Sequence, residues 1–375
     1  MLTAVIAVFT INEFQGPKMV NLEKVGNLRA VMCNVNGEDT VAILEPMNFG
    51  TSILSDSELL KHSTMSLSIG DLKSNHNVSS IPISFKTFES TVGKSRYDLV
   101  LGQESFEGVI ICVDYINEQT GFILSKQDNF ARRWLEGSGQ KGQFTTVKLT
   151  WNKSNLLVTD EFESDGSKSV VAPFLYDTST TMNLESNPRT LDGFIFRKKL
   201  VTNSGNVSNF DIGLWRGVRF AKTDIPLFLG SQLDKSGGEN TVPYNSFSLS
   251  SLGVRRIYVN TATNEIGFIK PSLKNLLEGI LRSAILNFPV FFDDDQLFVG
   301  RMPELVEGSL GKQLNGSRVI SIGDFLVSDF LEALESGVPD IEAILVKLVK
   351  HRSKDNLAVE VLKNGDKLKL NITPY

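Results

Sequence analysis

The chain has 375 residues, of which 41% are hydrophobic and 22% charged, and its formal net charge is -5 at pH 7. This composition excludes a disordered or fibrous chain and, at about 150 residues per domain, predicts two or three folded domains. The acidic balance, together with the lack of a basic stripe interleaved with aromatics, is untypical of nucleic-acid-binding proteins. We therefore expect no nucleic-acid partner.

Cysteine and histidine are scarce in this sequence. Cys33 and Cys112 are too few for a disulfide framework, and the three histidines are too scattered for a zinc site of usual spacing. We expect neither a metal nor a cofactor. The same scarcity leaves no convincing base for a nucleophilic Ser or Cys, so any hydrolytic chemistry would depend on carboxylates.

The first part of the chain has the pattern of an all-β protein. Leu2 to Ile11 is shorter than a membrane span and lacks a basic leader, so we expect a strand there and no membrane span. Short β-rich runs then alternate with Gly, Asn, Asp and Ser up to about residue 270. These runs are Leu28–Val35, Thr40–Leu44, Ile81–Phe85, Val109–Tyr115, Thr145–Trp151 and Arg256–Asn260.

The pattern changes near residue 272, which marks a domain boundary. Apolar residues at helical spacing predict helices over Lys274–Arg282, Asp329–Glu335 and Asp340–His351. Strand alternation returns in Leu357–Leu362 and Lys367–Ile372, on either side of an Asn-Gly turn.

An internal repeat divides the β-rich part. Ile81-Pro82-Ile83 recurs as Ile225-Pro226-Leu227, an offset of 144, and Thr120–Ile123 recurs as Ile266–Ile269, an offset of 146. Similar strands lie between these landmarks, Gly108–Asp114 in the first copy and Val254–Asn260 in the second. The repeat predicts two similar β-lobes of about 130 residues each.

The second lobe contains an apolar strand, Phe174–Tyr176, that ends in Asp177 and a hydroxyl-rich turn beginning with Thr178. This resembles the active-site loop of aspartic peptidases. In the first lobe, Glu45-Pro46-Met47 stands where the family has Asp-Thr-Gly. Tyr97–Phe106 resembles the family's crossing element with Gly102 at its glycine, and Phe247–Leu252 resembles the second copy with Ser250 in that place.

The resemblance implies that Asp177, positioned by Thr178, and Glu45 form a carboxylate pair that shares a proton and activates a water. Glu45 is one methylene longer than aspartate, and Pro46 removes a hydroxyl and an N–H, so we expect weak or absent proteolysis. The alternative is an active aspartic endopeptidase that uses Asp177 with Glu45. If neither residue is catalytic, we expect Asp177 to begin an exposed turn and Glu45 to be a surface carboxylate.

The last hundred residues resemble a PDZ domain of the bacterial, circularly permuted kind. Ile285, Leu286, Asn287 and Phe288 stand in the place of its Gly-Leu-Gly-Phe carboxylate-binding loop, and Glu360–Lys367 resembles its closing hairpin. The resemblance implies that peptide C-termini bind on the backbone of this loop. Because both loop glycines are missing, the alternative is that the loop packs against the lobes as a rigid cap.

We therefore expect a mainly β protein with two aspartic-peptidase-like β-barrel lobes, residues 1–135 and 136–272, and a C-terminal α/β PDZ-like domain, residues 276–375. We expect a monomer whose partners are a peptide or protein substrate, held extended between the lobes, and peptide C-termini. A periplasmic or cell-envelope location is slightly favoured over the cytoplasm. A purely structural scaffold is favoured instead if the chain's own side chains fill both the interlobe cleft and the terminal groove.

Overall fold

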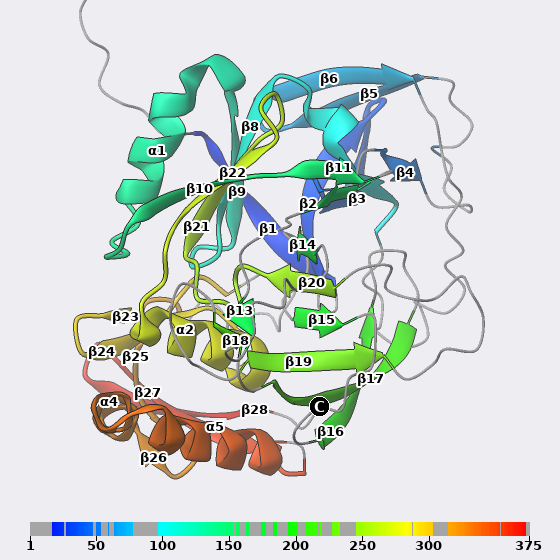
Figure 1. Cartoon of the computed structure of the whole chain (residues 1–375). Helices are drawn as coiled ribbons and strands as arrows, with labels where there is room; N and C mark the ends of the chain where they lie inside the picture. Colours follow the sequence, from blue (N-terminus) through cyan, green and yellow to red (C-terminus); the bar gives the residue numbers. More distant parts are fainter. Residues whose placement is uncertain are drawn as a thin grey trace, which may run out of the picture.

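The computed structural model of the chain is mainly β (Figure 1). It describes residues 17–25, 28–47, 50–53, 59, 64–77, 97–150, 248–286, 288–302, 314–352 and 354–372, together with the backbone of the strands between 151 and 247. The predicted strands in Leu2–Ile11 and Ile81–Phe85 lie outside the described residues.

An antiparallel arrangement of six strands forms the centre of the molecule. The strands come from two distant parts of the chain, in the order β10, β22, β21, β8, β9 and β1. Their bounds, in the same order, are Phe144–Lys148, Glu265–Ile269, Arg256–Asn260, Val109–Asp114, Gln119–Leu124 and Met19–Val25. The two halves of this arrangement therefore carry matching hairpins, β8–β9 and β21–β22, that meet side by side.

The register between β8 and β21 has the symmetry of the sequence repeat. Cys112 lies opposite Tyr258, and these two positions differ by 146, the offset between the second pair of landmarks. On either side of them, Asp114 lies opposite Arg256 and Ile110 opposite Asn260. With the offset of 146, Arg256 is the equivalent of Ile110 and Asn260 is the equivalent of Asp114. The two strands are therefore related by an approximate twofold axis that passes through the Cys112–Tyr258 pair.

Strand β8 is buried along its whole length because both faces of the sheet are covered. Alternate residues of a strand point to opposite faces. Ile110 and Cys112 pack with Trp134 and Leu135 of helix α1 (Asp128–Glu136), which lies over this face. Ile111 and Val113 face the main core instead. This double coverage explains why β8 is a continuous apolar run.

The first lobe continues from β1 into a twisted sheet that includes a tight hairpin at Asn36-Gly37, where both residues have positive φ. Strand β7 pairs parallel with β3 and antiparallel with β4, while β5 pairs with β2 and β6. The bounds are β2 Leu28–Val35, β3 Glu38–Leu44, β4 Ser52–Ile53, β5 Thr64–Ile69, β6 Leu72–Asn77 and β7 Leu99–Leu101, with 3-10 turns at Gln103–Phe106 and Ser125–Gln127.

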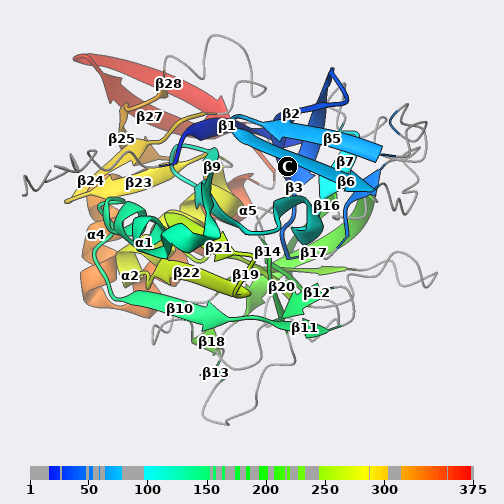
Figure 2. The ribbon, with the colours of Figure 1, turned by 90° about the horizontal axis from the view of Figure 1, so that it is seen from above.

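The second lobe repeats this connection pattern. Strand β20 pairs parallel with β14 and antiparallel with β15, as β7 does with β3 and β4. In Figures 1 and 2 the outer strands β16 and β17 lie on the opposite side of the molecule from α1. The bounds are β11 Thr150–Asn152, β12 Asn155–Leu157, β13 Glu163–Ser164, β14 Phe174–Asp177, β15 Asn183–Glu185, β16 Phe194–Val201, β17 Val207–Trp215, β18 Val218–Arg219, β19 Leu227–Gln232 and β20 Asn245–Ser248.

The C-terminal part is an antiparallel sheet in the order β23, β24, β25, β27 and β28, with β26 beside β25 and two helices packed on it. A buried helix, α2, continued by a π-helical segment, η4, precedes it. The bounds are α2 Leu273–Ile280, η4 Leu281–Leu286, β23 Val290–Asp293, β24 Gln296–Val299, β25 Arg318–Ile322, β26 Phe325–Leu326, α4 Val327–Ser336, α5 Val338–Arg352, β27 Leu357–Lys363 and β28 Asp366–Ile372. The three predicted helices and two predicted strands are present.

The C-terminal part packs tightly on the lobes. One continuous apolar core runs from the first lobe through α2 and η4 into the C-terminal sheet. The turn after β8 is held by Arg301, whose backbone N–H donates to Ile116 O at 2.9 Å and whose guanidinium donates to Glu118 O at 3.1 Å. Buried polar and apolar contacts therefore join the body to the C-terminal sheet.

Candidate functional site

The two crossing strands place Glu45 and Asp177 at equivalent positions of the two lobes. In the first lobe β3 ends level with β7, and Glu45 N–H, just beyond β3, donates to Leu101 O at 3.0 Å. In the second lobe, Asp177 is the last residue of β14 and lies opposite Ser248 of β20. The side chain of Asp177 and the whole of Thr178 lie outside the described residues.

The register also corrects one sequence interpretation. Adding the offset of 146 to β7, Leu99–Leu101, gives the first three residues of β20, and adding it to Gly102 gives Ser248. Ser248, and not Ser250, therefore stands where the first lobe has its glycine. Ser250 fits the local apolar-apolar-Gly pattern because it follows the apolar Leu249, whereas strand β20 ends at Ser248.

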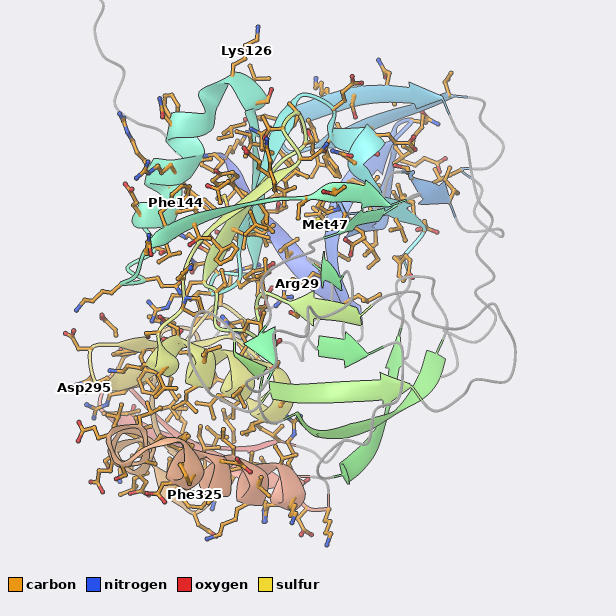
Figure 3. All side chains as sticks on the ribbon, viewed as in Figure 1. Arg29, Met47, Lys126, Phe144, Asp295 and Phe325 are labelled. Atoms are coloured by element: carbon orange, nitrogen blue, oxygen red, sulfur yellow. The ribbon has the colours of Figure 1, made fainter. Side chains whose placement is uncertain are left out.

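Glu45 is fully enclosed, with 0% of its surface exposed. Its Oε1 accepts a hydrogen bond from the backbone N–H of Met47 at 3.4 Å, across Pro46, and Met47 (labelled in Figure 3) is also completely buried. The interpretation of Glu45 as a surface carboxylate is therefore wrong. The carboxylate of Glu45 is directed toward the backbone of its own turn, which spans Glu45 to Met47.

A hydroxyl on a neighbouring strand end fixes the crossing element of the first lobe. Thr51 Oγ1 accepts from the N–H of Gly102 at 3.2 Å and lies 2.6 Å from Ser105 Oγ. The backbone N–H of Thr51 donates to Glu104 at 2.6 Å. Thr51 was not predicted from the sequence, because a single threonine in the segment Gly50-Thr51-Ser52 carries no spacing signal that links it to Gly102.

A buried ion pair and a second buried arginine contact Ser250 in the crossing element of the second lobe. Arg29, labelled in Figure 3, donates to both carboxylate oxygens of Glu118 at 2.8 and 3.3 Å and to Ser250 Oγ at 3.0 Å. Arg282 donates to Ser250 O at 2.6 Å. Burial lowers the pKa of Arg282 to about 10, and the charge of Glu278 opposes that shift. The network connects β2, the turn after β20 and η4.

The residues predicted to form a carboxylate-binding loop are helical and buried instead. Ile285 and Leu286 end η4 with 0% and 1% exposure, and the carbonyl of Ile285 accepts from Arg352 of α5. Phe288 is buried, and Asn287 lies outside the described residues. The described part of this segment is therefore packed inside the molecule, as in the alternative in which the loop packs against the lobes, and it does not form an open peptide-binding loop.

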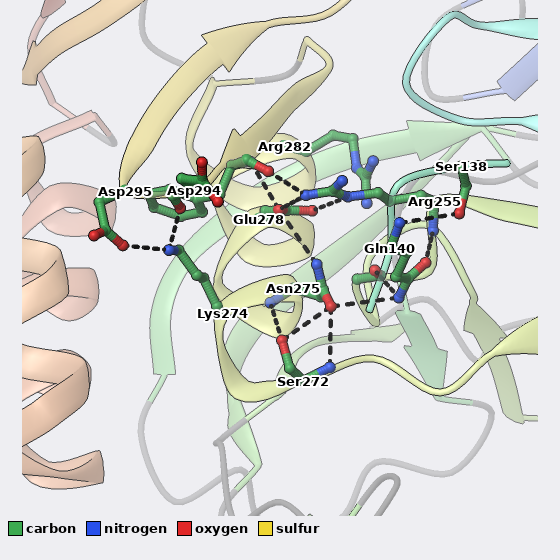
Figure 4. A network of polar contacts seen from close by, with 12 residues as sticks. Ser138, Gln140, Arg255, Ser272, Lys274, Asn275, Glu278, Arg282, Asp294 and Asp295 are labelled. Atoms are coloured by element: carbon green, nitrogen blue, oxygen red, sulfur yellow. Dashed lines mark hydrogen bonds and ion pairs between the residues drawn. The ribbon is translucent and has the colours of Figure 1, made fainter. Parts of the chain in front are cut away.

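In the edge strand β23, the backbone groups of Phe292 already have hydrogen-bond partners. Its backbone N–H donates to Glu278 Oε1 at 2.8 Å, and its carbonyl accepts from Arg255 Nη2 at 2.5 Å. Figure 4 shows Glu278 and Arg255 meeting in the centre of this polar network. A peptide strand added to a sheet edge needs those same backbone groups. At Phe292, the edge of β23 is therefore closed to strand addition.

The described residues hold no cluster of three or more His, Cys, Asp or Glu side chains placed to bind a metal ion. Within the described part of the chain, no helix is both long and apolar enough to cross a membrane.

Comparison with known proteins finds a likeness to solved structures. No protein-family model matches the sequence, and no curated protein matches it. Among the solved structures that match is an aspartic proteinase from Irpex lacteus, with 12% sequence identity and a TM-score of 0.36. The match covers 68% of this chain and 98% of that chain. The likeness is one of fold alone.

Proposed function

We propose that the chain is a non-proteolytic peptide-binding protein built on two aspartic-peptidase-like lobes. The observation that carries the proposal is the enclosure of Glu45 at the position equivalent to Asp177. The repeated crossing of β3 with β7 and of β14 with β20 supports the two-lobed part of the proposal.

The burial of Glu45 argues against proteolysis. A shared-proton carboxylate pair must reach both the attacking water and the substrate amide. Glu45 has no exposed surface, and Met47 N–H already donates to one of its oxygens. Pro46 has no N–H with which to orient a neighbouring carboxylate. A site in this arrangement lacks the second of the two groups that the reaction needs.

Binding of an extended peptide is assigned to the interlobe region and not to strand addition at the edge of the C-terminal sheet. Strands β3 and β14 bring Glu45 and Asp177 to equivalent positions of the two lobes, and the family resemblance associates such a pair of positions with an extended peptide. The C-terminal sheet has its edge at Phe292 occupied by Arg255 and Glu278. We propose that the C-terminal sheet stabilises the lobes by packing against them.

Two assays on the full chain test the proposal. We expect no cleavage of denatured protein at about pH 3 to 5, where carboxylate-pair peptidases work, and we expect fluorescein-labelled unstructured peptides to bind equally with free or amidated C-termini. Cleavage that disappears in Asp177→Asn would overturn the non-proteolytic proposal, and its loss in Glu45→Gln would assign the second carboxylate. Failure of every peptide in a random decapeptide pool to bind would overturn the binding proposal.

A further inference from the structure

A polar pocket of about 540 Å³ opens where the lobes meet the C-terminal sheet. Its walls are the Gly139–Lys141 loop after α1, the start of α2 and the turn between β23 and β24. This volume falls within the range of small-ligand sites, about 300 to 1,000 Å³. The pocket lies outside the crossing strands that carry Glu45 and Asp177.

An ion pair forms part of the pocket wall. Arg255 Nε and Nη2 donate to Glu278 at 3.0 and 2.5 Å, and Nη2 also donates to Phe292 O. The third nitrogen, Nη1, lies about 4.0 Å from where a Cβ of Gly139 would be, beside the loop that lines the pocket. Among the described residues Nη1 has no hydrogen-bond partner, although the Arg255 side chain is only 9% exposed. A donor nitrogen on a largely buried side chain is thus left unpaired beside the loop that lines the pocket.

The two ends of the pocket carry opposite charge. Lys141 lies at the loop end, exposed, and makes no ion pair with a described residue. At the other end, Lys274 pairs with Asp295 at 2.8 Å, while Asp293 and Asp294 have no side-chain partner among the described residues. Figure 4 shows Asp294 and Asp295 on one side of the network and, on the other side, Ser138 and Gln140 of the loop that leads to Lys141.

We propose that this pocket binds a short peptide with both termini free. The carboxylate is held by Arg255 Nη1 and Lys141, and the ammonium group by Asp293 and Asp294. Hydrogen bonds between charged partners are the stronger kind, and those made inside a pocket are less screened by water. A simple anion would satisfy only the loop end and would leave the two aspartates uncompensated. The proposal is independent of the interlobe site.

The test is calorimetric titration of the full chain with trialanine, N-acetyl-trialanine and trialanine amide. We expect the zwitterionic form to bind, and each blocked form to bind at least about tenfold more weakly, the loss of one charge-assisted contact. Lys141→Ala should weaken trialanine binding without changing the penalty for acetylation. Asp294→Asn should weaken trialanine binding without changing the penalty for amidation. Asn suits Asp294 because the residue has φ of 48°.

Matched controls are Lys148→Ala and Asp324→Asn, which remove the same charges from exposed positions outside the pocket. They should leave trialanine affinity unchanged. The proposal is wrong if trialanine does not bind, if the free and blocked forms bind equally, or if only the carboxylate matters, which would make the pocket an anion site. Because all four variants lie away from Glu45–Met47, each of these failures would leave the proposed interlobe function standing.

Discussion

Arg29 shows how much a single buried cation depends on its partner. Its guanidinium and the carboxylate of Glu118 are both almost completely enclosed. Removing one member of such a pair leaves the other as an uncompensated buried charge, which costs about 3 to 5 kcal/mol. We expect Arg29→Ala to lower the free energy of unfolding by that amount, measured by urea denaturation.

The matched control for that prediction is Arg132→Ala, which breaks the exposed pair with Glu136. An exposed pair contributes about 1 kcal/mol or less. A loss in Arg29→Ala no larger than in Arg132→Ala would contradict the prediction.

The cysteines give a pH dependence with a defined sign. Burial raises the pKa of Cys33 from 9.0 to about 12, with the charges of Asp98 and Asp39 acting in the same direction. The unfolded chain therefore loses the thiol proton first, and stability falls as the pH rises above about 9. The slope is about 1.4 kcal/mol per pH unit for each such thiol.

We expect Cys33→Ala to flatten this decline between about pH 9 and 11, in urea titrations at several pH values. Cys112, whose pKa burial also raises, would still contribute its own slope. Identical pH slopes for the wild-type chain and Cys33→Ala would show that Cys33 is not protected in this way.

At this scale the sequence predicted the position of Glu45 but not its environment. Short motifs with strand spacing were enough to place it at the end of β3. Its burial depends on the return of Met47 N–H to its own carboxylate and on packing by distant chain segments, which no local pattern encodes. Thr51 was missed for the same reason, since its partners Gly102 and Ser105 are more than fifty residues away.

Helix α2 approaches another backbone so closely at Gly279 that a side chain there would force the two backbones apart. A Cβ at Gly279 would overlap the carbonyl oxygen of Ser251 and the N–H of Gly253. Alanine normally stabilises a helix interior by about 1 kcal/mol relative to glycine. Because the obstacle here is backbone, we expect Gly279→Ala to be net destabilising by about 1 to 3 kcal/mol in thermal or urea unfolding.

Gly50→Ala is the control, since a Cβ there would meet no atom of the described residues within 4 Å. It should change stability by less than about 1 kcal/mol. A stabilised Gly279→Ala protein would mean that α2 does not lie against Ser251 as described.

Periodicity predicted the C-terminal helices and strands in their observed order, whereas the loop that the PDZ resemblance implied at Ile285 and Leu286 is helical. A carboxylate-binding loop needs glycines that release the backbone from helical geometry. Without them, an apolar run continues the helix from Leu273 to Leu286, and the chain becomes extended only near Pro289. Periodicity was enough to predict which segments form helices and which form strands. The position where this helix ends depended on the absence of the two loop glycines, which periodicity does not report.

At the scale of the whole molecule, the C-terminal sheet is expected to unfold together with the lobes. The change of pattern near residue 272 predicts separate domains on either side of that position, which lies between β22 and α2. The described contacts across it are extensive, however, because α2 and η4 are buried and belong to the common core. We expect a single cooperative transition.

Two probes report on different parts of the chain and so test this directly. All three tryptophans lie in the lobes, at positions 134, 151 and 215, whereas the longest described helices, α4 and α5, belong to the C-terminal part. Tryptophan fluorescence and far-ultraviolet circular dichroism should give the same urea midpoint. Loss of the helical signal at lower urea would instead indicate independent units.

The pairing of β8 with β21 has a consequence for biosynthesis. At about 5 to 20 residues per second, β21 leaves the ribosome on the order of ten seconds after β8. During that interval β8 presents an unpaired edge, and edges of this kind are templates for intermolecular pairing. In the folded chain Cys112 lies opposite Tyr258, its equivalent in the repeat. Strand β8 of a second nascent chain can therefore pair with β8 in the same antiparallel register, with Cys112 opposite Cys112. A chain truncated after α1 is therefore expected to self-associate through β8, as a dimer in size-exclusion chromatography that Ile111→Lys abolishes.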